Sequence, residues 1–228
     1  MDRIKDVTET FDEYAEEYDK WFESPYGAVL FQMETEAVRL LAKRIKKPFL
    51  EIGVGTGRFA KELGIEFGID PSPKLLGIAL KRGIKVRKAK GERLPFRDES
   101  FGAVFILFTL CFVEDAGLVL TESKRVLRKD GKIIVGIINK ESSWGRLYAG
   151  MAAEGHPIYK HARFYSMAEV TSLMEKAGLS IEALSSILYQ QPTGMPYKES
   201  ARPGLSGEAG FVCILAKKGN SRVGLGES

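Results

Sequence analysis

An apolar, strand-like segment that runs directly into three glycines at alternate positions is the feature that most constrains the fold of this chain. The segment is LEIGVGTGRF, residues 50–59, and its glycines are Gly53, Gly55 and Gly57. Glycine allows backbone torsions closed to other residues and removes the Cβ atom that would hold a ligand away from the chain. A buried strand that ends in such a turn and continues into a helix is typical of an α/β fold with a ligand at the carboxyl end of its sheet.

An acidic residue follows the glycine turn at a spacing that suits a nucleoside. Asp70 lies 15 residues after Gly55, in GIDPS, at the end of the next expected strand. Adjacent strands of a doubly wound sheet open their carboxyl ends into one crevice, so Asp70 should meet the vicinal hydroxyls of a ribose lying over the glycines. A tight turn without a ligand is the alternative, and it explains neither Glu51 before the turn nor Asp70 after it.

The spacing of the glycines also distinguishes between nucleosides. A dinucleotide fold requires G-x-G-x-x-G, in which the last glycine lets a helix start close beneath a pyrophosphate. Here the order is G-x-G-x-G, and Glu51 places a carboxylate where it would repel a pyrophosphate. The turn therefore favours a cationic ligand.

Beyond the turn, short apolar runs alternate with amphipathic segments, which predicts a parallel sheet with helices on both faces. Two helices have explicit boundaries. One has Ser72 as N-cap and Gly83 just past its end, and the other has Ser166 as N-cap, in a capping box, and stops at Gly178. Strands are expected at 48–54, 65–70, 85–90, 102–110, 132–139, 180–190 and 210–217.

The N-terminal region has helical rather than strand-like patterning. It should form two helices broken near Ser24 and Pro25, because proline cannot continue a helix and restrains the residue before it. These helices should cover the sheet as a cap belonging to the same domain. The expected boundaries are 1–47 for the cap, 48–218 for the main part with a cap insertion at about 140–165, 192–210 for a long mobile loop and 219–228 for a flexible tail.

Composition and charge give no support to a nucleic-acid partner. The chain has 228 residues, 44% of them apolar, and a formal net charge of +4 at pH 7. Residues 81–93 contain seven basic side chains and one acidic one. A helix end and a protected edge strand explain them better than a phosphate footprint, which would need interleaved aromatic residues.

Cysteine use and hydropathy predict a cytoplasmic protein. Cys111 and Cys213 lie 102 positions apart in apolar runs, so neither a metal site nor a disulfide is expected. The longest apolar run, 101–113, is too short to span a bilayer. Only 2 Asn and 3 Gln occur, a scarcity of thermolabile amides that indicates a heat-adapted source.

Several blocks, in order, resemble the class I S-adenosylmethionine-dependent methyltransferases, in the branch of small-molecule enzymes called type 11. The resemblance implies a Rossmann-like, doubly wound, mostly parallel seven-stranded sheet with an antiparallel last strand and a helical cap. Besides the glycine turn, the matching blocks are TFDEYAEEYDKWF at 10–22, KGERLPF at 90–96, FGAVFILFTLCFVED at 101–115, RVLRKDGKIIVG at 125–136 and ARFYSMAEVTSLMEKAGL at 162–179.

The resemblance also implies a cofactor site for S-adenosylmethionine. The glycine turn would lie along the methionine part and the ribose, Glu51 would help to hold the polar end, and Asp70 would bind the ribose hydroxyls. Residues 90–92 would border the adenine, and 108–110 would flank the methyl donor. The expected cofactor residues are Tyr14, Tyr18, Glu51, Gly53, Gly55, Gly57, Asp70, Pro71, Gly91, Glu92, Phe108, Thr109 and Leu110.

Two departures from the family pattern affect the chemistry. Lys90 stands where the family commonly has an acidic residue that accepts from the adenine amino group, and an ammonium only donates. Glu92 or a backbone carbonyl would substitute for it. The frequent Leu-His-His-Val is Leu-Cys-Phe-Val at 110–113, so this block supplies no histidine base.

Methyl transfer from a sulfonium is an in-line displacement with a neutral leaving group, so positioning dominates and a base is optional. The candidates for a base are Tyr18, His156 and His161, each of which has an alternative structural role. Trp144 and Arg146 could line the acceptor pocket or make ordinary cap contacts.

The expected function is methyl transfer to a small-molecule acceptor that no motif identifies. A non-catalytic nucleoside-binding or regulatory protein is the first alternative, because no base is evident. An NAD-dependent oxidoreductase is the second. The acceptor should be held by the least patterned regions, 10–22, 140–165 and 190–210.

Overall fold

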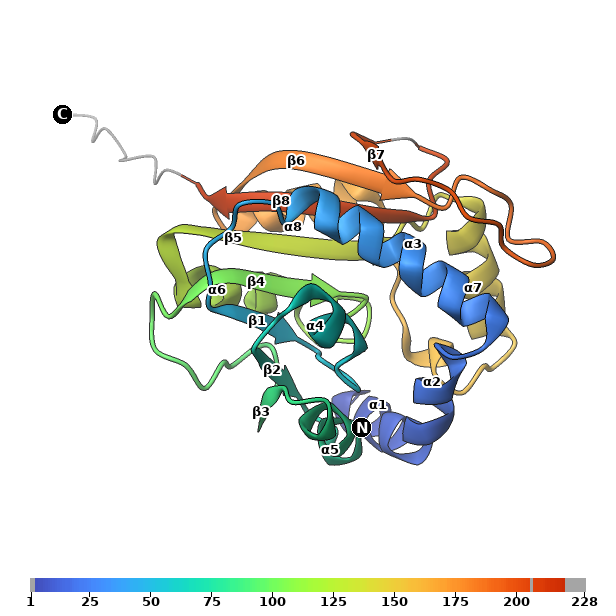
Figure 1. Cartoon of the computed structure of the whole chain (residues 1–228), viewed down its shortest axis with the longest axis horizontal. Helices are drawn as coiled ribbons and strands as arrows, with labels where there is room; N and C mark the ends of the chain where they lie inside the picture. Colours follow the sequence, from blue (N-terminus) through green and yellow to red (C-terminus); the bar gives the residue numbers. More distant parts are fainter. Residues whose placement is uncertain (1–2, 206, 220–228) are drawn as a thin grey trace.

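An eight-stranded sheet forms the centre of the molecule (Figure 1). The structure is a computed structural model that describes residues 3–205 and 207–219, with side chains from residue 7 onward. The strand order is β3-β2-β1-β4-β5-β8-β6-β7. The strands are β1 Phe49–Ile52, β2 Phe67–Asp70, β3 Lys85–Lys88, β4 Phe101–Leu107, β5 Leu127–Ile138, β6 Leu179–Ile187, β7 Arg202–Pro203 and β8 Phe211–Lys218.

The sheet is mostly parallel, as predicted, with an antiparallel C-terminal part. β3, β2, β1, β4 and β5 run parallel, and β8 inserts antiparallel between β5 and β6. The expected number of seven strands was one too low. Arg202–Pro203 pairs with Ser185 and Ser186 of β6, inside the segment expected to be a loop. Two residues with no apolar alternation carry no strand signal in the sequence.

Helices cover both faces of the sheet. On one face α3 packs against β6 and β8, and α4 and α5 join the same apolar cluster. On the other face α6 and α8 pack against β5 and β6 (Figure 1). The helices are α1 Arg3–Glu13, α2 Ala15–Trp21, α3 Pro25–Leu41, α4 Arg58–Leu63, α5 Pro73–Lys81, α6 Ala116–Val126, α7 Ser143–Ala153 and α8 Met167–Lys176, with a 3₁₀ turn η1 at Tyr159–His161.

The predicted helix starts are confirmed at atomic detail. The Ser24, Ser72 and Ser166 hydroxyls accept hydrogen bonds from backbone N–H groups at 3.0, 3.1 and 3.2 Å, and Ser166 completes its capping box. The N-terminal region has one break more than expected. Tyr14 leaves helical geometry between α1 and α2, with φ −98° and ψ 18°.

Polar contacts attach the N-terminal helices to the sheet layer. Asp19 of α2 accepts hydrogen bonds from Arg58, at the start of α4, at 2.9 and 2.8 Å, and from Arg82, after α5, at 2.7 Å. Burial raises the pKa of Asp19, but these guanidinium donors outweigh it and hold the pKa well below its usual range. Asp12 of α1 accepts from the Ser72 hydroxyl at the start of α5. α1 and α2 are therefore fixed over the carboxyl ends of β1 and β2.

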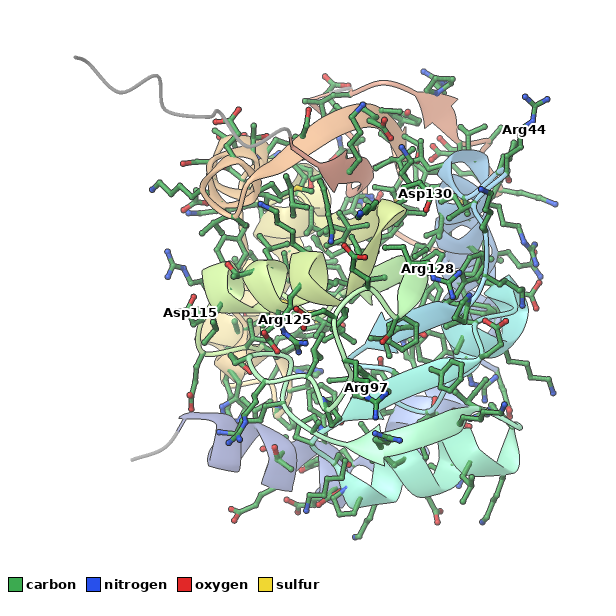
Figure 2. All side chains as sticks on the ribbon, turned by 90° about the vertical axis from the view of Figure 1, so that its left-hand side faces the viewer. Arg44, Arg97, Asp115, Arg125, Arg128 and Asp130 are labelled. Carbon is green, nitrogen blue, oxygen red and sulfur yellow. The ribbon has the colours of Figure 1, made fainter. Side chains whose placement is uncertain are left out.

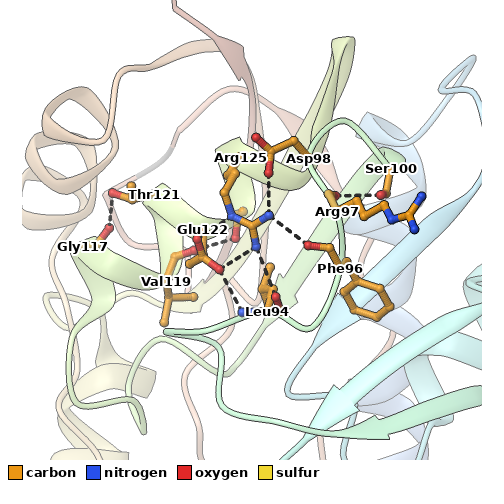
Figure 3. A network of polar contacts seen from close by, with 11 residues as sticks. Leu94, Phe96, Arg97, Asp98, Ser100, Gly117, Val119, Thr121, Glu122 and Arg125 are labelled. Atoms are coloured by element: carbon orange, nitrogen blue, oxygen red, sulfur yellow. Dashed lines mark hydrogen bonds and ion pairs between the residues drawn. The ribbon is translucent and has the colours of Figure 1, made fainter.

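A second polar network fixes the connection between β3 and β4. The Arg125 guanidinium of α6 donates to the carboxylates of Glu122 and Asp98 and to the carbonyls of Phe96 and Leu94 (Figure 3). The Leu94 N–H returns a bond to Glu122 at 2.9 Å. This network holds the chain that immediately follows residues 90–92.

Charges of both signs share the face that Figure 2 presents, where Arg97, Arg125 and Asp130 are labelled. The basic stretch 81–93 makes intramolecular contacts. Arg82 binds Asp19, and Arg87 donates to the Pro95 carbonyl at 2.8 Å and lies over the Phe96 ring.

The segment 192–210 is anchored at several points. Besides the pairing of β7, the Glu199 carboxylate accepts from the backbone N–H groups of Tyr189 and Gln190, both at 2.9 Å. Of the expected tail, only Gly219 is among the described residues, and its N–H donates to Gly178 at 2.9 Å. Residues 220–228 lie outside them.

Candidate active site

A cavity of about 720 Å³ opens at the carboxyl ends of β1, β2 and β4. Its volume falls within the range of about 300–1,000 Å³ that small-molecule sites occupy. α1, α2, α7 and η1 close it opposite the sheet. It has two parts with different walls. We call the part lined by Gly53, Gly55, Asp70, Gly91 and Glu92 the sheet side, and the part lined by Tyr26, Glu34, Tyr148, His156 and Tyr159 the cap side.

Two of the three turn glycines form the cavity floor. Gly53 has φ +70°, and a Cβ there would lie 2.3 Å from Thr109 Oγ1. Gly55 has φ +53°, and only the Tyr18 ring would come near its Cβ, at 3.8 Å. Gly57 does not line the cavity, and a Cβ there would lie 3.1 Å from the Ala79 side chain of α5. The structure thus places Gly53 and Gly55 at the cavity and gives Gly57 a packing role.

Asp70 is fixed by the turn that it was expected to serve. Its carboxylate is 7% exposed and accepts from Gly55 N at 3.0 Å and from Ser72 N at 2.9 Å. Burial raises the pKa of Asp70 to about 6, although these two hydrogen bonds lower it. Each carboxylate oxygen accepts one of these bonds and keeps further lone-pair capacity.

Two other carboxylates have buried oxygens without a partner. Glu51 Oε2 makes no hydrogen bond within the described chain, and burial, then the charge of Asp70, raises the pKa of Glu51 well above its usual value. Glu92 Oε1 accepts from the backbone N–H groups of Glu114 and Asp115, whereas its Oε2 is buried and unpartnered. A buried oxygen without a donor is costly. Glu92 lines the cavity, where a ligand can donate to it, whereas Glu51 directly precedes the lining residues Ile52 and Gly53 and is not itself among them.

The other predicted sheet-side residues divide between the cavity and the core. Phe108 and Thr109 line the cavity, as does Pro71, and Phe108 has a positive φ of 56° while its ring stacks on Phe211 at 4.6 Å. Strain of this kind concentrates at ligand sites. Leu110 is 2% exposed and belongs to the core.

Lys90 also lines the cavity, and its ammonium lies 3.8 Å from Glu114 Oε1.

Tyr14 and Tyr18 cover the turn from above. Both line the cavity, and the Tyr18 ring makes edge-to-face contacts with Phe11 and Phe22 at 5.6 and 5.4 Å. Burial raises the pKa of Tyr18 far above its usual value, and the neighbouring Tyr159, Asp70, Glu51 and Glu34 raise it further. Tyr18 is therefore a neutral hydrogen-bond donor and a poor general base.

Comparison with known proteins agrees with this geometry. A family model described as "Methyltransferase domain" matches residues 50–135. A crystal structure from Thermotoga maritima, described as a SAM-dependent methyltransferase and possible histamine N-methyltransferase, superposes with a TM-score of 0.86 at 37% identity, over 93% of this chain and 99% of that one. The chain belongs to the S-adenosylmethionine-dependent methyltransferases. The cofactor is accordingly S-adenosylmethionine, and the nicotinamide alternative is wrong.

Two further relatives of the methyltransferase differ in what their names state. An uncharacterised protein of Methanocaldococcus jannaschii is 42% identical over 91% of this chain and 98% of its own length. A demethylmenaquinone methyltransferase of Thermotoga maritima is 32% identical over 58% of this chain and 61% of its own. These sources agree with the heat adaptation that the composition indicates.

The histidines of the methyltransferase occupy different places. His156 lines the cap side, and its Nδ1 accepts from the backbone N–H groups of Ile158 and Tyr159 at 3.3 and 3.4 Å. The lone pair that a base needs is therefore occupied, and burial lowers the pKa of His156. His161 lies outside the cavity lining, where its Nε2 bonds Thr10 of α1 at 3.1 Å.

Two residues that were considered as possible acceptor contacts, Trp144 and Arg146, make ordinary structural contacts instead. Trp144 is 1% exposed, and its indole N–H donates to the Gln190 carbonyl at 2.8 Å. Arg146 is exposed and donates to the Glu141 carbonyl at 2.7 Å. Neither lines the cavity.

Sequence reasoning missed Glu34. It lies on α3, is 5% exposed and lines the cap side. Its signal in the sequence is an acidic residue between Leu30 and Val38 on the apolar face of an amphipathic helix, at the i and i+4 spacing that brings side chains together.

The described residues were also compared with the requirements of a metal site and of a membrane-spanning helix. Among the described residues, no group of three or more His, Cys, Asp or Glu side chains could hold a metal ion. Within the same part of the chain, none of the helices combines the length and the apolar character needed to cross a bilayer.

Proposed function

We propose that the methyltransferase transfers the methyl group of S-adenosylmethionine to a small molecule bound on the cap side of the cavity. The unpartnered buried oxygen of Glu92, which lines the cavity, supports this proposal most strongly, together with that of Glu51, which precedes the lining residues Ile52 and Gly53. Both need hydrogen-bond donors, and the cofactor offers them at its ends, as the methionine ammonium and the adenine amino group.

Each end of the cofactor has a matching group on the sheet side. Glu51 would hold the ammonium, Asp70 the ribose hydroxyls, and Glu92 Oε2 the adenine amino group in place of the acidic residue that Lys90 replaces. Gly55 leaves room for the chain of the ligand to pass directly over the backbone. When bound, the cofactor supplies an electrophilic methyl group on a sulfonium. The residues of this protein bind it, orient it and exclude water from it.

Calorimetry with S-adenosylhomocysteine tests the cofactor site. The wild-type protein should bind it, and NAD should give no heat. Asp70→Ala should weaken binding by at least about tenfold, because a hydrogen bond to a charged group contributes about 1.5–3 kcal/mol. Glu36→Gln is the control, since that carboxylate accepts from Ala201 N and does not line the cavity.

Turnover separates an enzyme from a binding protein. Conversion of S-adenosylmethionine to S-adenosylhomocysteine, dependent on an added small molecule, supports the proposal. Binding without turnover on any acceptor would favour the non-catalytic alternative.

A further inference from the structure

The cap side contains a buried carboxyl group that none of the described residues neutralises. Glu34 is 5% exposed and lines the cavity. It makes neither a hydrogen bond nor an ion pair with any other residue in 7–205 or 207–219. Glu51 Oε2 is fully enclosed and has no hydrogen-bond partner. Neither oxygen of Glu34 is enclosed in this way, so both have access to the cavity. A buried carboxylate aimed at a cavity is unfavourable unless a ligand donates to it.

The electrostatics of the cap side disfavour an anionic ligand. Lys90 is the only Lys or Arg among the described residues that line the cavity. It follows β3, at one edge of the sheet, whereas α3, which carries Glu34, packs on β6 and β8 toward the other edge. His156 is held neutral by burial. A carboxylate or phosphate on the cap side would therefore meet Glu34 without a compensating cation.

The walls around Glu34 suit a cation with an organic body. The Tyr159 ring packs against Tyr148 at 4.7 Å and His156 at 4.6 Å, and the Phe164 ring lies 6.3 Å from Tyr148. Among the described residues, neither the Tyr148 nor the Tyr159 hydroxyl makes a hydrogen bond to Glu34. Aromatic faces attract ammonium groups, by about 2 kcal/mol where water is excluded.

We propose that the acceptor is an amine and that Glu34 binds its ammonium form and takes up its proton. This inference rests on the proposed function, because it concerns the acceptor of the same methyl transfer. Ionised Glu34 accepts a proton from the ammonium, which leaves a neutral carboxyl group and frees the nitrogen lone pair. The lone pair then forms the N–C bond to the methyl group as the S–C bond breaks and its electron pair returns to sulfur. The products are a methylammonium and a neutral thioether, and Glu34 releases its proton to water.

The environment of Glu34 makes it a suitable proton acceptor. Burial raises the pKa of Glu34 to about 8, much closer to that of an amine than the pKa of an exposed carboxyl group. Burial raises the pKa of Tyr18, Tyr148 and Tyr159, which belong to α2, α7 and η1, and the charge of Glu34 raises the pKa of each further. These phenols remain neutral, which leaves Glu34 as the titrating group on the cap side.

Ligand selectivity of the wild-type protein is the first test. The probes are 2-phenylethylamine and hexylamine, each with the alcohol and the carboxylate of the same skeleton, titrated into protein saturated with S-adenosylhomocysteine. At least one amine should bind at least about tenfold more tightly than both counterparts, because they lack the charge that pairs with Glu34. If no amine binds better than its counterparts, the inference is wrong.

The variant Glu34→Gln assigns the selectivity to this residue. It should reduce amine binding at least about tenfold and leave S-adenosylhomocysteine binding within about twofold. Glu17→Gln is the matched control, because Glu17 lines the same cavity but is exposed. Equal losses in both variants, or a large loss of S-adenosylhomocysteine binding in Glu34→Gln alone, would overturn the role of Glu34. Failure of the wild-type protein to bind S-adenosylhomocysteine would instead overturn the proposed function.

Discussion

The two sides of the cavity are built in different ways. The sheet side comes from three consecutive connections at the carboxyl ends of β1, β2 and β3, and its polar groups are held by backbone bonds such as Gly55 N to Asp70 at 3.0 Å. The cap side comes from α3, α7 and η1, which are more than a hundred residues apart at their extremes, and its charged group, Glu34, is held by packing alone. Short connections therefore build the sheet side locally, whereas the cap side needs segments that lie far apart in the chain.

The largest expected effect is a loss of stability when a side chain is added at Gly53 on the sheet side. Gly53→Ala should lower the free energy of unfolding by about 3 kcal/mol or more, because the new Cβ would meet Thr109 Oγ1 at 2.3 Å in a left-handed conformation. S-adenosylhomocysteine binding should be lost with it. Gly83→Ala is the control, since its φ is +86° but nothing lies within 4 Å, and it should cost about 1–2 kcal/mol. Equal losses in urea unfolding would show that the clash is relieved.

The difference between locally built and distantly assembled parts also explains which features the sequence could predict. The sequence predicted that Gly53, Gly55 and Asp70 open into one crevice, and all three line the cavity. This was predictable because their positions depend on a few neighbouring residues and on the register of adjacent parallel strands. The caps at Ser72 and Ser166 were predictable for the same reason.

What the sequence missed depends on contacts between distant segments. The sequence places Glu34 on the apolar face of its helix but does not show that residues of α7 and η1 line a cavity with it. It also does not show that Trp144 packs against Gly210 and donates to Gln190. β7 forms only because the chain after Glu199 returns to β6. The position of Gly57 against Ala79 likewise depends on how the start of α4 lies against α5, which glycine spacing does not encode.

The second effect concerns the Arg125 network, which holds the chain that follows residues 90–92 of the sheet side. Arg125→Met should lower the free energy of unfolding by about 2 kcal/mol, because it removes donors from two carboxylates and two carbonyls and leaves Glu122 half-buried without its partner. Lys46→Met removes an exposed ion pair with Asp130 and should change stability by less than about 0.5 kcal/mol. Thermal and urea unfolding of both variants check the difference, and similar values would mean that the Arg125 network is no stronger than a surface pair.

The third effect is a pH dependence of S-adenosylhomocysteine binding that comes from Asp70 on the sheet side. Burial raises the pKa of Asp70 to about 6, so this carboxylate is ionised above pH 6 and protonated below it. Only the ionised form accepts from both ribose hydroxyls. S-adenosylhomocysteine should therefore bind about tenfold more weakly at pH 5 than at pH 8, since one pH unit below the pKa leaves about a tenth of the group ionised. In Asp70→Asn the decline near pH 6 should disappear from the calorimetric profile, and its persistence would assign the titration to another group.

The smallest expected effect concerns His156, the histidine that sequence reasoning weighed as a base. Its Nδ1 accepts two backbone N–H groups, so Nε2 carries the proton of the neutral imidazole and no lone pair on the ring is free. His156→Gln keeps a polar side chain at this position and should reduce kcat by less than about threefold, far below the factor of 10² or more expected for a general base. Its pH profile should match that of the wild type, whereas Glu34→Gln should alter both kcat/KM for the amine and the profile. If kcat instead fell a hundredfold in His156→Gln and was unchanged in Glu34→Gln, His156 would be the proton acceptor and the role proposed for Glu34 would be wrong.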